Sequence, residues 1–567
     1  MASLIKKIIG GKPYYYARES KRVDGKPKIV WQKYLGRPED IIARCSAEPA
    51  APKPSEAMVR EFGAVMALYD LAQRLNLVEH IDRHVPKRGA GPSVGTYLLV
   101  AILNRCLAPC SKAGIGEWFA TTPLGRYLPL EAKQLTSQRY WDNMERVSPE
   151  AITAIERDVV AQMVRDFEVD LSRVLFDATN FFTFIDTFNT RSELAQRGHS
   201  KEGRKALRIV GLALLVSADF HLPLLHHTYP GNQTDAPTFK SLTDALVARY
   251  RELATGTEHV TLVFDKGNNS GDNLEAVEAG PYHFVGSLVP TQHPQLLAVS
   301  AEQLRSLEEE GLAGVSAYRT RYEVFGVERT VLVTYNENLF VTQSQTLLRE
   351  IAKRQQQLRE LQTQLQRWHR GPLRGKPPTI DGVQKKVNGW LKARHMKDLF
   401  TVTIEKKRGL PTLRYRFEHR AWQQLQKTLL GKTLIFTDND DWSDAEIVRG
   451  YRAQHHVEAA FRQMKDPHHI ALRPQYHWTD QKIEVHIFCC VLALLLVSLL
   501  TRQMHRRGIT LSSTTLLESL SAIREVGVLF PPTDKSASPR LQMTLSSLST
   551  EQRSLYEALD LARYLAS

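Results

Sequence analysis

The chain has 567 residues, of which 43% are hydrophobic and 24% are charged. This length and composition allow two to four domains with real hydrophobic cores, and they exclude a disordered or fibrous chain. The formal net charge is +14, and the Lys and Arg residues are spread along the sequence. We therefore expect a polyanionic partner, with nucleic acid as the first candidate, and not a small acidic substrate.

The cysteines are too few for a disulfide scaffold and lack the paired spacing of a zinc ribbon. Cys106 and Cys110 could share a helix face and bind a metal, but no second Cys or His pair accompanies them, so we favour core packing. All five are expected to be buried thiols in a reducing compartment. They are Cys45, Cys106, Cys110, Cys489 and Cys490.

The first third of the chain predicts three segments. Residues 1–46 alternate aromatic and basic positions around the turn-like Val23-Asp24-Gly25-Lys26, which predicts a small basic β-hairpin module. Residues 47–55 are rich in Pro and Ala and are interpreted as a linker. Residues 56–167 carry apolar side chains at three- and four-residue spacing, which predicts a helical domain for DNA binding or dimerisation. A domain that serves packing alone explains the same spacing equally well.

Residues 168–294 have the pattern of an α/β domain. An apolar run at 174–177 ends in Asp177, and two longer strands follow at 207–217 and 222–229. After a helix at 236–253, a second apolar run at 259–265 ends in Asp265. A helix at 271–279 and a strand at 283–288 complete the segment, so acids lie at the ends of the first and fourth strands.

The next segment, residues 295–435, is interpreted as a β-rich insertion into this domain. It contains four strand-like stretches and one long polar helix, at 318–325, 329–335, 399–404, 413–417 and 344–367 respectively. After a strand at 433–436, the sequence Ser443-Asp-Ala-Glu446 is a capping box that opens a helix ending before Pro467.

Residues 436–500 are therefore predicted to hold the second part of the α/β core, and 501–567 a C-terminal tail region. The apolar run at 487–500 is too short to cross a bilayer and predicts a helix buried in a large core.

One stripe of the helix before Pro467 carries an unusual set of side chains. Its five members lie at offsets of 0, 3, 7, 11 and 14, within an arc of about 80°. An acid among phosphate-binding groups is a poor packing surface, but it suits a site that grips and cuts a metal-bound nucleic-acid phosphate. The five are Tyr451, Gln454, Glu458, Arg462 and Lys465.

Three acids together indicate the chemistry. Two-metal phosphoryl transfer needs two or three carboxylates that bridge a pair of Mg²⁺ ions. Asp177 and Asp265 at strand ends, with Glu458 on a helix, fit this requirement. Each Asp alone is more simply explained as a helix cap or turn former. In this strand order, however, they indicate a ribonuclease-H-like domain, in which the first and fourth strands are neighbours.

With these motifs the chain resembles a DDE transposase of the IS4-like superfamily, most closely its IS1634 group. The third-acid motif of that family is Tyr-x2-Arg-x3-Glu-x6-Lys, and here Gln454 takes the place of the Arg. The first and second acid motifs resemble Leu175-Phe-Asp177-Ala-Thr179 and Val263-Phe-Asp265-Lys-Gly267. Three further similar segments are Gly198-His-Ser200-Lys201, Gly231-Asn232 with Asp235, and Tyr476-His-Trp478 ahead of His486.

The resemblance implies that Asp177, Asp265 and Glu458 are catalytic metal ligands, with Mg²⁺ as the cofactor and Mn²⁺ able to substitute. It implies that Tyr451 and Lys465 hold DNA near the cleaved phosphate. The implied partners are double-stranded DNA, as transposon ends and target, and further copies of the chain in a homodimer or larger assembly on DNA. The implied location is the prokaryotic cytoplasm, in association with the nucleoid.

Gln454 can still donate to a phosphate oxygen, but it lacks the charge and the bidentate fork of Arg. Arg462 is predicted to supply the missing charge. Lys201 and Arg204 lie in a polar loop that is predicted to touch the DNA backbone, although a solvated loop is an equal alternative.

Two further hypotheses concern aromatic and histidine residues. Trp368 or Trp390 could stack on an extrahelical base, but buried Trp is commoner. A zinc site is disfavoured, because neighbouring histidines on a helix point apart. Its ligands would be His455, His456, His468 and His469.

The predicted function is a transposase that binds terminal inverted repeats, nicks the element ends, and joins the freed 3′-hydroxyl to target DNA. One alternative is a metal-dependent nuclease of the same fold, which would hydrolyse DNA without strand transfer. The other is a DNA-binding protein descended from a transposase that no longer cleaves, although all three acids are intact in this sequence.

Overall fold

The computed structural model describes residues 2–565, apart from 24–25, 47–52, 88, 90, 187, 200–202, 204–205, 234–259, 281, 372–373, 474 and 533–538. Lys201, Arg204 and the predicted helix at 236–253 lie outside the described residues. The chain divides into two compact units. The first contains residues 1–60, 524–548 and 563–567, and the second contains 61–523 and 549–562.

The first unit contains two three-stranded sheets. One is antiparallel in the order β1-β2-β3, in which β2 and β3 form the predicted hairpin and β1 adds a third strand. The other has the order β17-β16-β4. The bounds are β1 (Ala2–Ile9), β2 (Lys12–Val23), β3 (Lys26–Gly36), α1 (Pro38–Ser46), β4 (Glu56–Glu61), β16 (Arg524–Phe530) and β17 (Arg540–Leu545).

The strand β4 corrects one expectation, because residues 56–61 were predicted to begin the helical domain. β4 lies beside β16, a strand more than four hundred residues later in the chain. The local residue pattern gives no information about such long-range pairing. The helical domain was therefore predicted to begin at residue 56, although the helical spacing itself begins only at residue 65.

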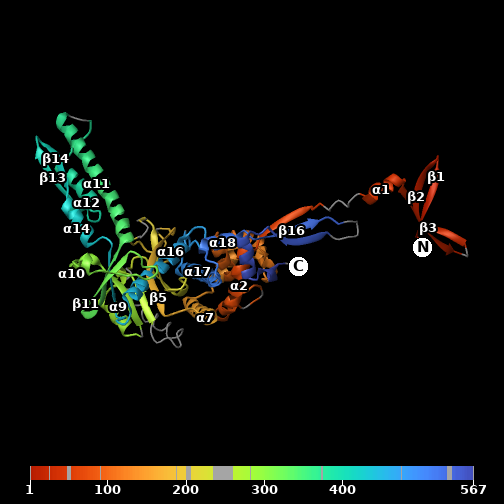
Figure 1. The fold of residues 1–567 in the computed structure, drawn as a ribbon, viewed down its shortest axis with the longest axis horizontal. Coiled ribbons are helices and arrows are strands. Elements are labelled where there is room, and N and C mark those ends of the chain that lie inside the picture. Colours follow the sequence, from red (N-terminus) through yellow and green to blue (C-terminus); the bar gives the residue numbers. More distant parts are fainter. Residues whose placement is uncertain are drawn as a thin grey trace. The chain divides into compact units, whose positions relative to one another are not determined.

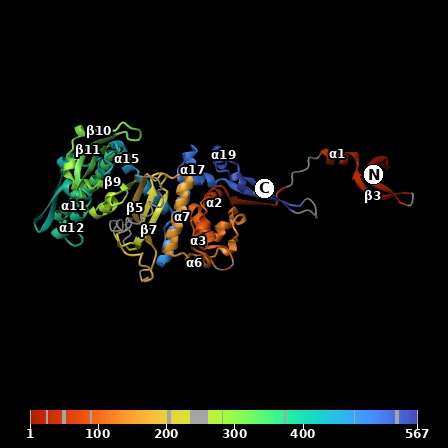
Figure 2. The ribbon, with the colours of Figure 1, turned by 90° about the horizontal axis from the view of Figure 1, so that it is seen from below.

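The second unit begins with six helices: α2 (Gly63–Arg74), α3 (Leu77–His84), α4 (Val94–Leu107), α5 (Ile115–Ala120), α6 (Ser137–Met144) and α7 (Pro149–Phe167). Hydroxyl side chains cap three of them, since Ser93, Thr136 and Ser148 accept from the first-turn N–H groups of α4, α6 and α7. Helices α2, α4 and α7 pack against α17 (Asp480–Arg506), and Figure 2 shows α7 and α17 side by side.

The helix α17 is the predicted buried helix, longer than expected at 27 residues. In the described part of the chain it is the one helix that is apolar enough and long enough to cross a bilayer. However, 94% of its most apolar 18-residue stretch is buried in the protein. It also packs on β7 and α16, so one helix serves as core for both the helical domain and the sheet. Cys489 and Cys490 lie buried on it and Cys106 is buried too, as predicted, but Cys45 is exposed and Cys110 is half-buried. All five are free thiols.

A nine-stranded mixed sheet forms the centre of the described second unit (Figure 1), in the order β10-β11-β12-β15-β9-β8-β5-β6-β7. Five of these strands are the predicted core strands. β5 runs antiparallel to β6 and parallel to β8, and β8 runs parallel to β9, so the first and fourth strands are neighbours as expected. Their bounds are β5 (Arg173–Thr183), β6 (Arg208–Ser217), β7 (Pro223–Pro230), β8 (Val260–Phe264) and β9 (Tyr282–Leu288).

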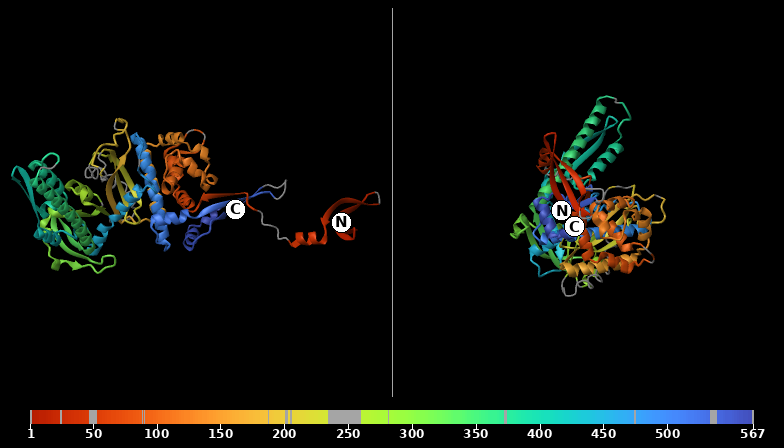
Figure 3. Two further views of the ribbon diagram at one scale, coloured as in Figure 1. Left: turned by 90° about the horizontal axis from the view of Figure 1, so that it is seen from above. Right: turned by 90° about the vertical axis from the view of Figure 1, so that its right-hand side faces the viewer.

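The predicted insertion is not a separate β-rich body. Three of its strands, with the strand that follows it, extend the central sheet beyond β9: β10 (Arg305–Ser306), β11 (Val315–Val324), β12 (Val327–Asn336) and β15 (Lys432–Thr437). The remainder forms a lobe around the long helix α11 (Glu337–Arg370), shown in Figure 3.

In that lobe, the hairpin of β13 (Phe400–Lys407) and β14 (Leu410–Phe417) shares a hydrophobic core with α11 and α12 (Ile380–Leu391). The short helices α13 (Met396–Leu399) and α14 (His419–Thr428) complete it. α12, α13 and α14 were not predicted from the sequence.

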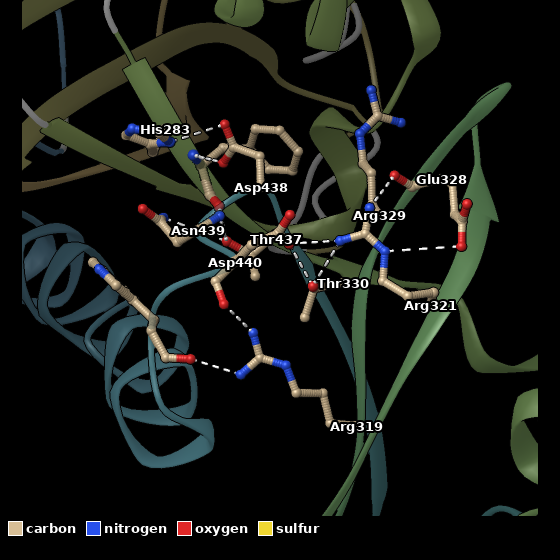
Figure 4. A network of polar contacts seen from close by, with 12 residues as sticks. His283, Arg319, Arg321, Glu328, Arg329, Thr330, Thr437, Asp438, Asn439 and Asp440 are labelled. Carbon is tan, nitrogen blue, oxygen red and sulfur yellow. Dashed lines mark hydrogen bonds and ion pairs between the residues drawn. The ribbon is translucent and has the colours of Figure 1, made fainter.

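A polar network fixes the junction between β15 and the next helix, α15 (Asp444–Arg452), as Figure 4 shows. Asp438 accepts from the Phe284 N–H (2.7 Å) and lies 3.1 Å from His283 Nδ1. Asp440 accepts from Arg321 (2.7 Å) and Thr330 (2.5 Å). The hydrogen bond from Thr330 and the adjacent Arg321 lower the pKa of Asp440, so it stays charged. The network ties three strands to the start of α15.

Candidate active site

Asp177 and Asp265 lie on neighbouring parallel strands. The last residue pair in register between β5 and β8 is Phe176 with Phe264, and each aspartate is the next residue along its strand. Strand spacing therefore puts their Cα atoms roughly 5 Å apart, with both side chains on one face of the sheet. This adjacency is the arrangement that the sequence analysis expected.

The position of Asp177 within its strand differs from the prediction. β5 continues six residues past it to Thr183, paired along its whole length with β6. The acid interrupts the apolar pattern without ending the strand, because the Thr and Phe residues that follow it at 179, 181, 182 and 183 suit a paired strand. Asp265 does follow the end of β8, and its carboxylate caps no helix, which contradicts the helix-cap explanation and leaves that of a turn former.

The predicted single helix from 443 to 465 is two helices. α15 ends at Arg452, and α16 (His455–Lys465) begins after a tight turn at Ala453 and Gln454. The capping box of Ser443 and Glu446 is present as predicted. At the turn the Gln454 N–H bonds to the Tyr451 carbonyl three residues back, in place of four. The five-residue stripe is therefore divided, with Tyr451 on α15 and three members on α16.

Helix α16 lies across the face of the sheet to which Asp177 points. Lys465 Nζ donates to Thr179 Oγ1 (2.7 Å) and to the carbonyl of Asn180 (3.1 Å). Thr179 is two residues from Asp177 on β5, so their side chains share a face. Lys465 thus joins the end of α16, the helix that carries Glu458, to β5, the strand that carries Asp177.

Tyr451 is sensitive to the charges of the other two acids. Burial raises the pKa of its phenol, a hydrogen bond with Ser287 lowers it in part, and the carboxylates of Asp265 and Glu458 raise it again, so the net shift is upward. A phenol with a raised pKa keeps its proton at neutral pH and remains a hydrogen-bond donor. Glu458 itself is exposed in the first turn of α16. Both carboxylates therefore lie near enough to Tyr451 to act on its phenol electrostatically, and that phenol is a donor of the kind that a phosphate oxygen accepts from.

The acids offer oxygen donors of the type that Mg²⁺ and Mn²⁺ prefer. Among the described residues, no group of three or more His, Cys, Asp or Glu side chains is close enough to hold a metal ion by itself. Mg²⁺ commonly uses one or two carboxylates together with water and substrate phosphate, and seldom a complete protein cage. The adjacent pair Asp177 and Asp265 fits that mode, and Glu458 lies exposed in the first turn of α16.

The two remaining members of the stripe differ in exposure. Gln454 is only 9% exposed, which does not favour its predicted contact with DNA. Arg462 is exposed on α16, one turn beyond Glu458. Of these two, Arg462 is the side chain with access to a DNA backbone.

The glycine motifs found by resemblance have a packing explanation that the sequence did not show. A Cβ added to Gly198 would lie 2.1 Å from the Gly231 carbonyl oxygen, and one added to Gly231 would lie 1.9 Å from the Ile209 carbonyl oxygen. Two loops and β6 therefore approach closely at these positions. His199, in the first of these loops, accepts from Asn180 on β5 through its carbonyl (3.0 Å).

The segment from Tyr476 to Trp478, with His486, combines buried and exposed residues. His477 and His486 are buried with stacked rings, whereas Tyr476 is 65% exposed and Trp478 is 43% exposed. Tyr476 stacks on Phe184, just past the end of β5, at a centroid distance of 5.3 Å. Only the resemblance of the segment as a whole pointed to these aromatic rings.

The secondary hypotheses find little support in this structure. The rings of His455 and His456 are 4.0 Å apart, and in the described chain these two do not assemble with His468 and His469 into a metal-binding group. Trp390 is half-buried against the core of the insertion lobe, with Lys386 over its ring. These residues are better explained by packing.

Arg462 and Lys465, one turn apart on α16, should behave differently when each is replaced by Met. Lys465→Met removes two hydrogen bonds to β5, so we expect a loss of about 1 kcal/mol in the free energy of unfolding. Arg462→Met should change it by less than about 0.5 kcal/mol but weaken DNA binding. Urea denaturation and a DNA-binding titration measure the two effects. Equal stability of both variants would contradict the anchoring role of Lys465.

A histidine in the turn after β6 contacts α16 and makes the stability of the protein depend on pH. His221 Nε2 lies 3.3 Å from Gln463 Oε1, and burial lowers the pKa of His221 from 6.5 to about 4. Between these two values the unfolded chain binds the proton and the folded chain does not. The contribution of His221 to the free energy of unfolding is therefore fully present above pH 6.5. It declines as the pH falls to 4, and the loss from this group is at most about 3 kcal/mol.

Asparagine is the suitable replacement, because His221 has a φ of +47°, a conformation that Asn tolerates. We expect unfolding of His221→Asn to depend less on pH between 6.5 and 4 than unfolding of the natural chain. His468→Asn, at an exposed position in the loop that follows α16, is the control. Identical pH profiles for all three proteins would show that His221 does not titrate as inferred.

Paired acids on adjacent strands, with a glutamate helix laid across them, define the class of DDE phosphoryl-transfer domains. Comparison with protein families agrees: residues 171–496 match the family described as Transposase DDE domain. This match covers more than half of the chain, and the chain belongs to that family. Its reaction class is accordingly DNA phosphoryl transfer, and DNA is its partner.

Two further comparisons add little. No curated protein sequence matches the chain. Among solved structures, a piggyBac transposase synaptic complex with hairpin DNA is similar over 82% of each chain, with a TM-score of 0.35 and 7% identity.

Proposed function

We propose that this protein is the transposase of an insertion sequence and that it binds the terminal inverted repeats of its element. The observation that carries the proposal is the adjacency of Asp177 and Asp265 on β5 and β8, in a chain of the transposase DDE family. The ribonuclease-H-like description of the sheet rests on the same strand order. Assignment to the IS1634 group of the IS4-like superfamily rests on the motif resemblance.

In this proposal Asp177, Asp265 and Glu458 hold Mg²⁺, or Mn²⁺ in its place. Bound metal would supply Lewis-acid polarisation of the scissile phosphate and lower the pKa of the attacking water. Tyr451 would donate its phenolic proton to a phosphate oxygen, and Arg462 would neutralise backbone charge. Lys465, through its hydrogen bonds to Thr179 and Asn180, would hold α16 against β5.

The chemistry proposed has two steps at one site. Hydrolysis breaks a P–O3′ bond at the element end and leaves a 3′-hydroxyl. The oxygen of that hydroxyl then attacks a target phosphorus, forming a new P–O bond as a target P–O3′ bond breaks. No covalent protein intermediate is required. Because two ends join one target, we propose a homodimer or larger assembly on DNA, working in the prokaryotic cytoplasm beside the nucleoid.

The DNA that flanks the gene provides the test. Matched inverted repeats on both sides supply the substrate, and incubation with protein and Mg²⁺ should cut at their outer ends. A pre-cut end with a free 3′-hydroxyl should then be joined to a plasmid. Cutting without joining would favour a nuclease of the same fold, and binding without cutting would favour a DNA-binding protein that has lost catalysis.

A further inference from the structure

The sheet of β1, β2 and β3 holds a disproportionate share of the positive charge. Residues 2–36 contain nine Lys or Arg residues and only two acids, Glu19 and Asp24, a net charge of +7. This is half of the formal charge of +14, in a small fraction of the 567 residues. So dense a charge on a small sheet favours a polyanion as partner.

The strand register shows which side chains share a face. Residues paired across antiparallel strands point the same way, and alternate residues of one strand do too. Lys6 pairs with Tyr15, Lys33 with Ala17, and Lys28 with Lys21. Tyr15, Ala17 and Lys21 are alternate positions of β2, so their side chains point to the same face. The register shifts between residues 19 and 20 of β2, where Val30 of β3 has no partner. Because the unpaired residue belongs to β3, the alternation of β2 is not interrupted. We call the face that carries Lys6, Lys21, Lys28 and Lys33 the lysine face.

The opposite face provides the internal packing of the sheet. Tyr34 lies 6.2 Å from Tyr14 and 5.2 Å from Tyr16 between ring centroids. Lys7 lies over the Tyr16 ring and Arg37 over the Tyr14 ring, so cations and aromatic rings satisfy one another there. The lysine face has a different composition: among the described residues it carries one acid, Glu19, which follows the same alternation of β2 and pairs with Trp31.

The lysine face is open. All four lysines are exposed, and within the described residues none of them has an ion pair or a hydrogen bond. Lys21 and Lys28 lie directly opposite one another, an arrangement of like charges that destabilises a sheet unless an anion lies between them. Apolar side chains lie among them on the same face, with Leu4 64% exposed, Ile8 69% and Trp31 48%.

We infer that the lysine face binds double-stranded DNA, with its lysines on the phosphates and its apolar side chains toward a groove. This inference rests on the proposed function and adds the module that grips the DNA. Antiparallel β-ribbons enter the major groove, which is about 12 Å wide. Charge complementarity selects DNA over a second copy of the same basic sheet, because two such faces would repel one another.

The test uses the full-length chain and a labelled duplex of arbitrary sequence, titrated at several salt concentrations. Each lysine–phosphate contact contributes about −0.9 to the slope of log affinity against log salt. Replacing all four lysines of the lysine face by Gln should make the slope shallower by about 3 to 4 and weaken binding at low salt. Replacing the same four by Arg should leave the slope unchanged, because the charge remains.

A second quadruple Lys→Gln variant removes equal charge from exposed positions of the insertion lobe: Lys385, Lys406, Lys407 and Lys427. The inference is upheld if the lysine-face variant loses clearly more slope than this control. It is overturned if the two variants lose the same slope, or if the lysine-face variant loses self-association and keeps the natural slope. Absence of duplex binding by the natural chain would instead reject the proposed function.

Discussion

Replacing Glu458 by Gln should abolish DNA cleavage and leave binding to element ends nearly intact. The substitution keeps the size of the side chain and removes the charge that a divalent ion needs. Partners that only orient metal ligands already cost 10–100-fold when mutated, so we expect a loss of at least about 100-fold. Asp177→Asn and Asp265→Asn should have the same effect, because the two aspartates are neighbours on β5 and β8.

The matched control for Glu458→Gln lies on the preceding helix. Glu446 completes the capping box of α15, and Gln can take the same position in such a box. Glu446→Gln should therefore retain cleavage within a few-fold. Cleavage at the natural rate by Glu458→Gln would refute the assignment of Glu458 as a metal ligand. The readouts are gel-resolved cleavage of labelled ends and a parallel mobility shift.

Replacing Arg502 by Met should cause the largest loss of stability. Arg502 is 3% exposed on α17, and its guanidinium lies 2.5 Å from Asp219 in the turn after β6. It also donates to the carbonyls of Phe167 (2.8 Å) and Glu168 (2.9 Å), at the end of α7. Its removal takes the buried donor from all three acceptors, of which the Phe167 carbonyl keeps only a 3.5 Å contact with Arg506, so we expect a loss of about 3–5 kcal/mol in the free energy of unfolding.

Arg506, one turn further along α17, is the control for this prediction. It approaches the same region, with a 3.6 Å ion pair to Glu168, but its side chain is 55% exposed. Exposed ion pairs contribute little, so Arg506→Met should lose less than about 1 kcal/mol. Urea denaturation followed by circular dichroism measures both. Similar losses for the two variants would show that burial does not distinguish these arginines.

Local signals predicted the parts of the site that depend on local structure. The capping box at Ser443 and the run before Asp265 are patterns of a few residues, and both lie where expected. The break after Arg452 was missed because Ala453 and Gln454 keep near-helical dihedrals, so the apolar period continues while the hydrogen bonds shift. The full length of β5 was missed because its pairing with β6 is long-range.

The insertion shows a similar limit. Its strands were found from alternation and its long helix from composition, but neither signal says which strand pairs with which. β12 pairs with β15, about a hundred residues later, and this pairing joins the insertion to the central sheet. Pairing depends on distant partners, and a single sequence contains little information about them.

The position of α17 in the chain has a consequence for synthesis. The helices that pack against it are complete by Phe167, but α17 ends only at Arg506. At roughly 5–20 residues per second, about 20 to 70 s separate the two. During that interval the apolar faces of α2, α4 and α7 lack their central partner. We therefore expect the nascent chain to depend on chaperones, and truncated products that end before α17 to aggregate.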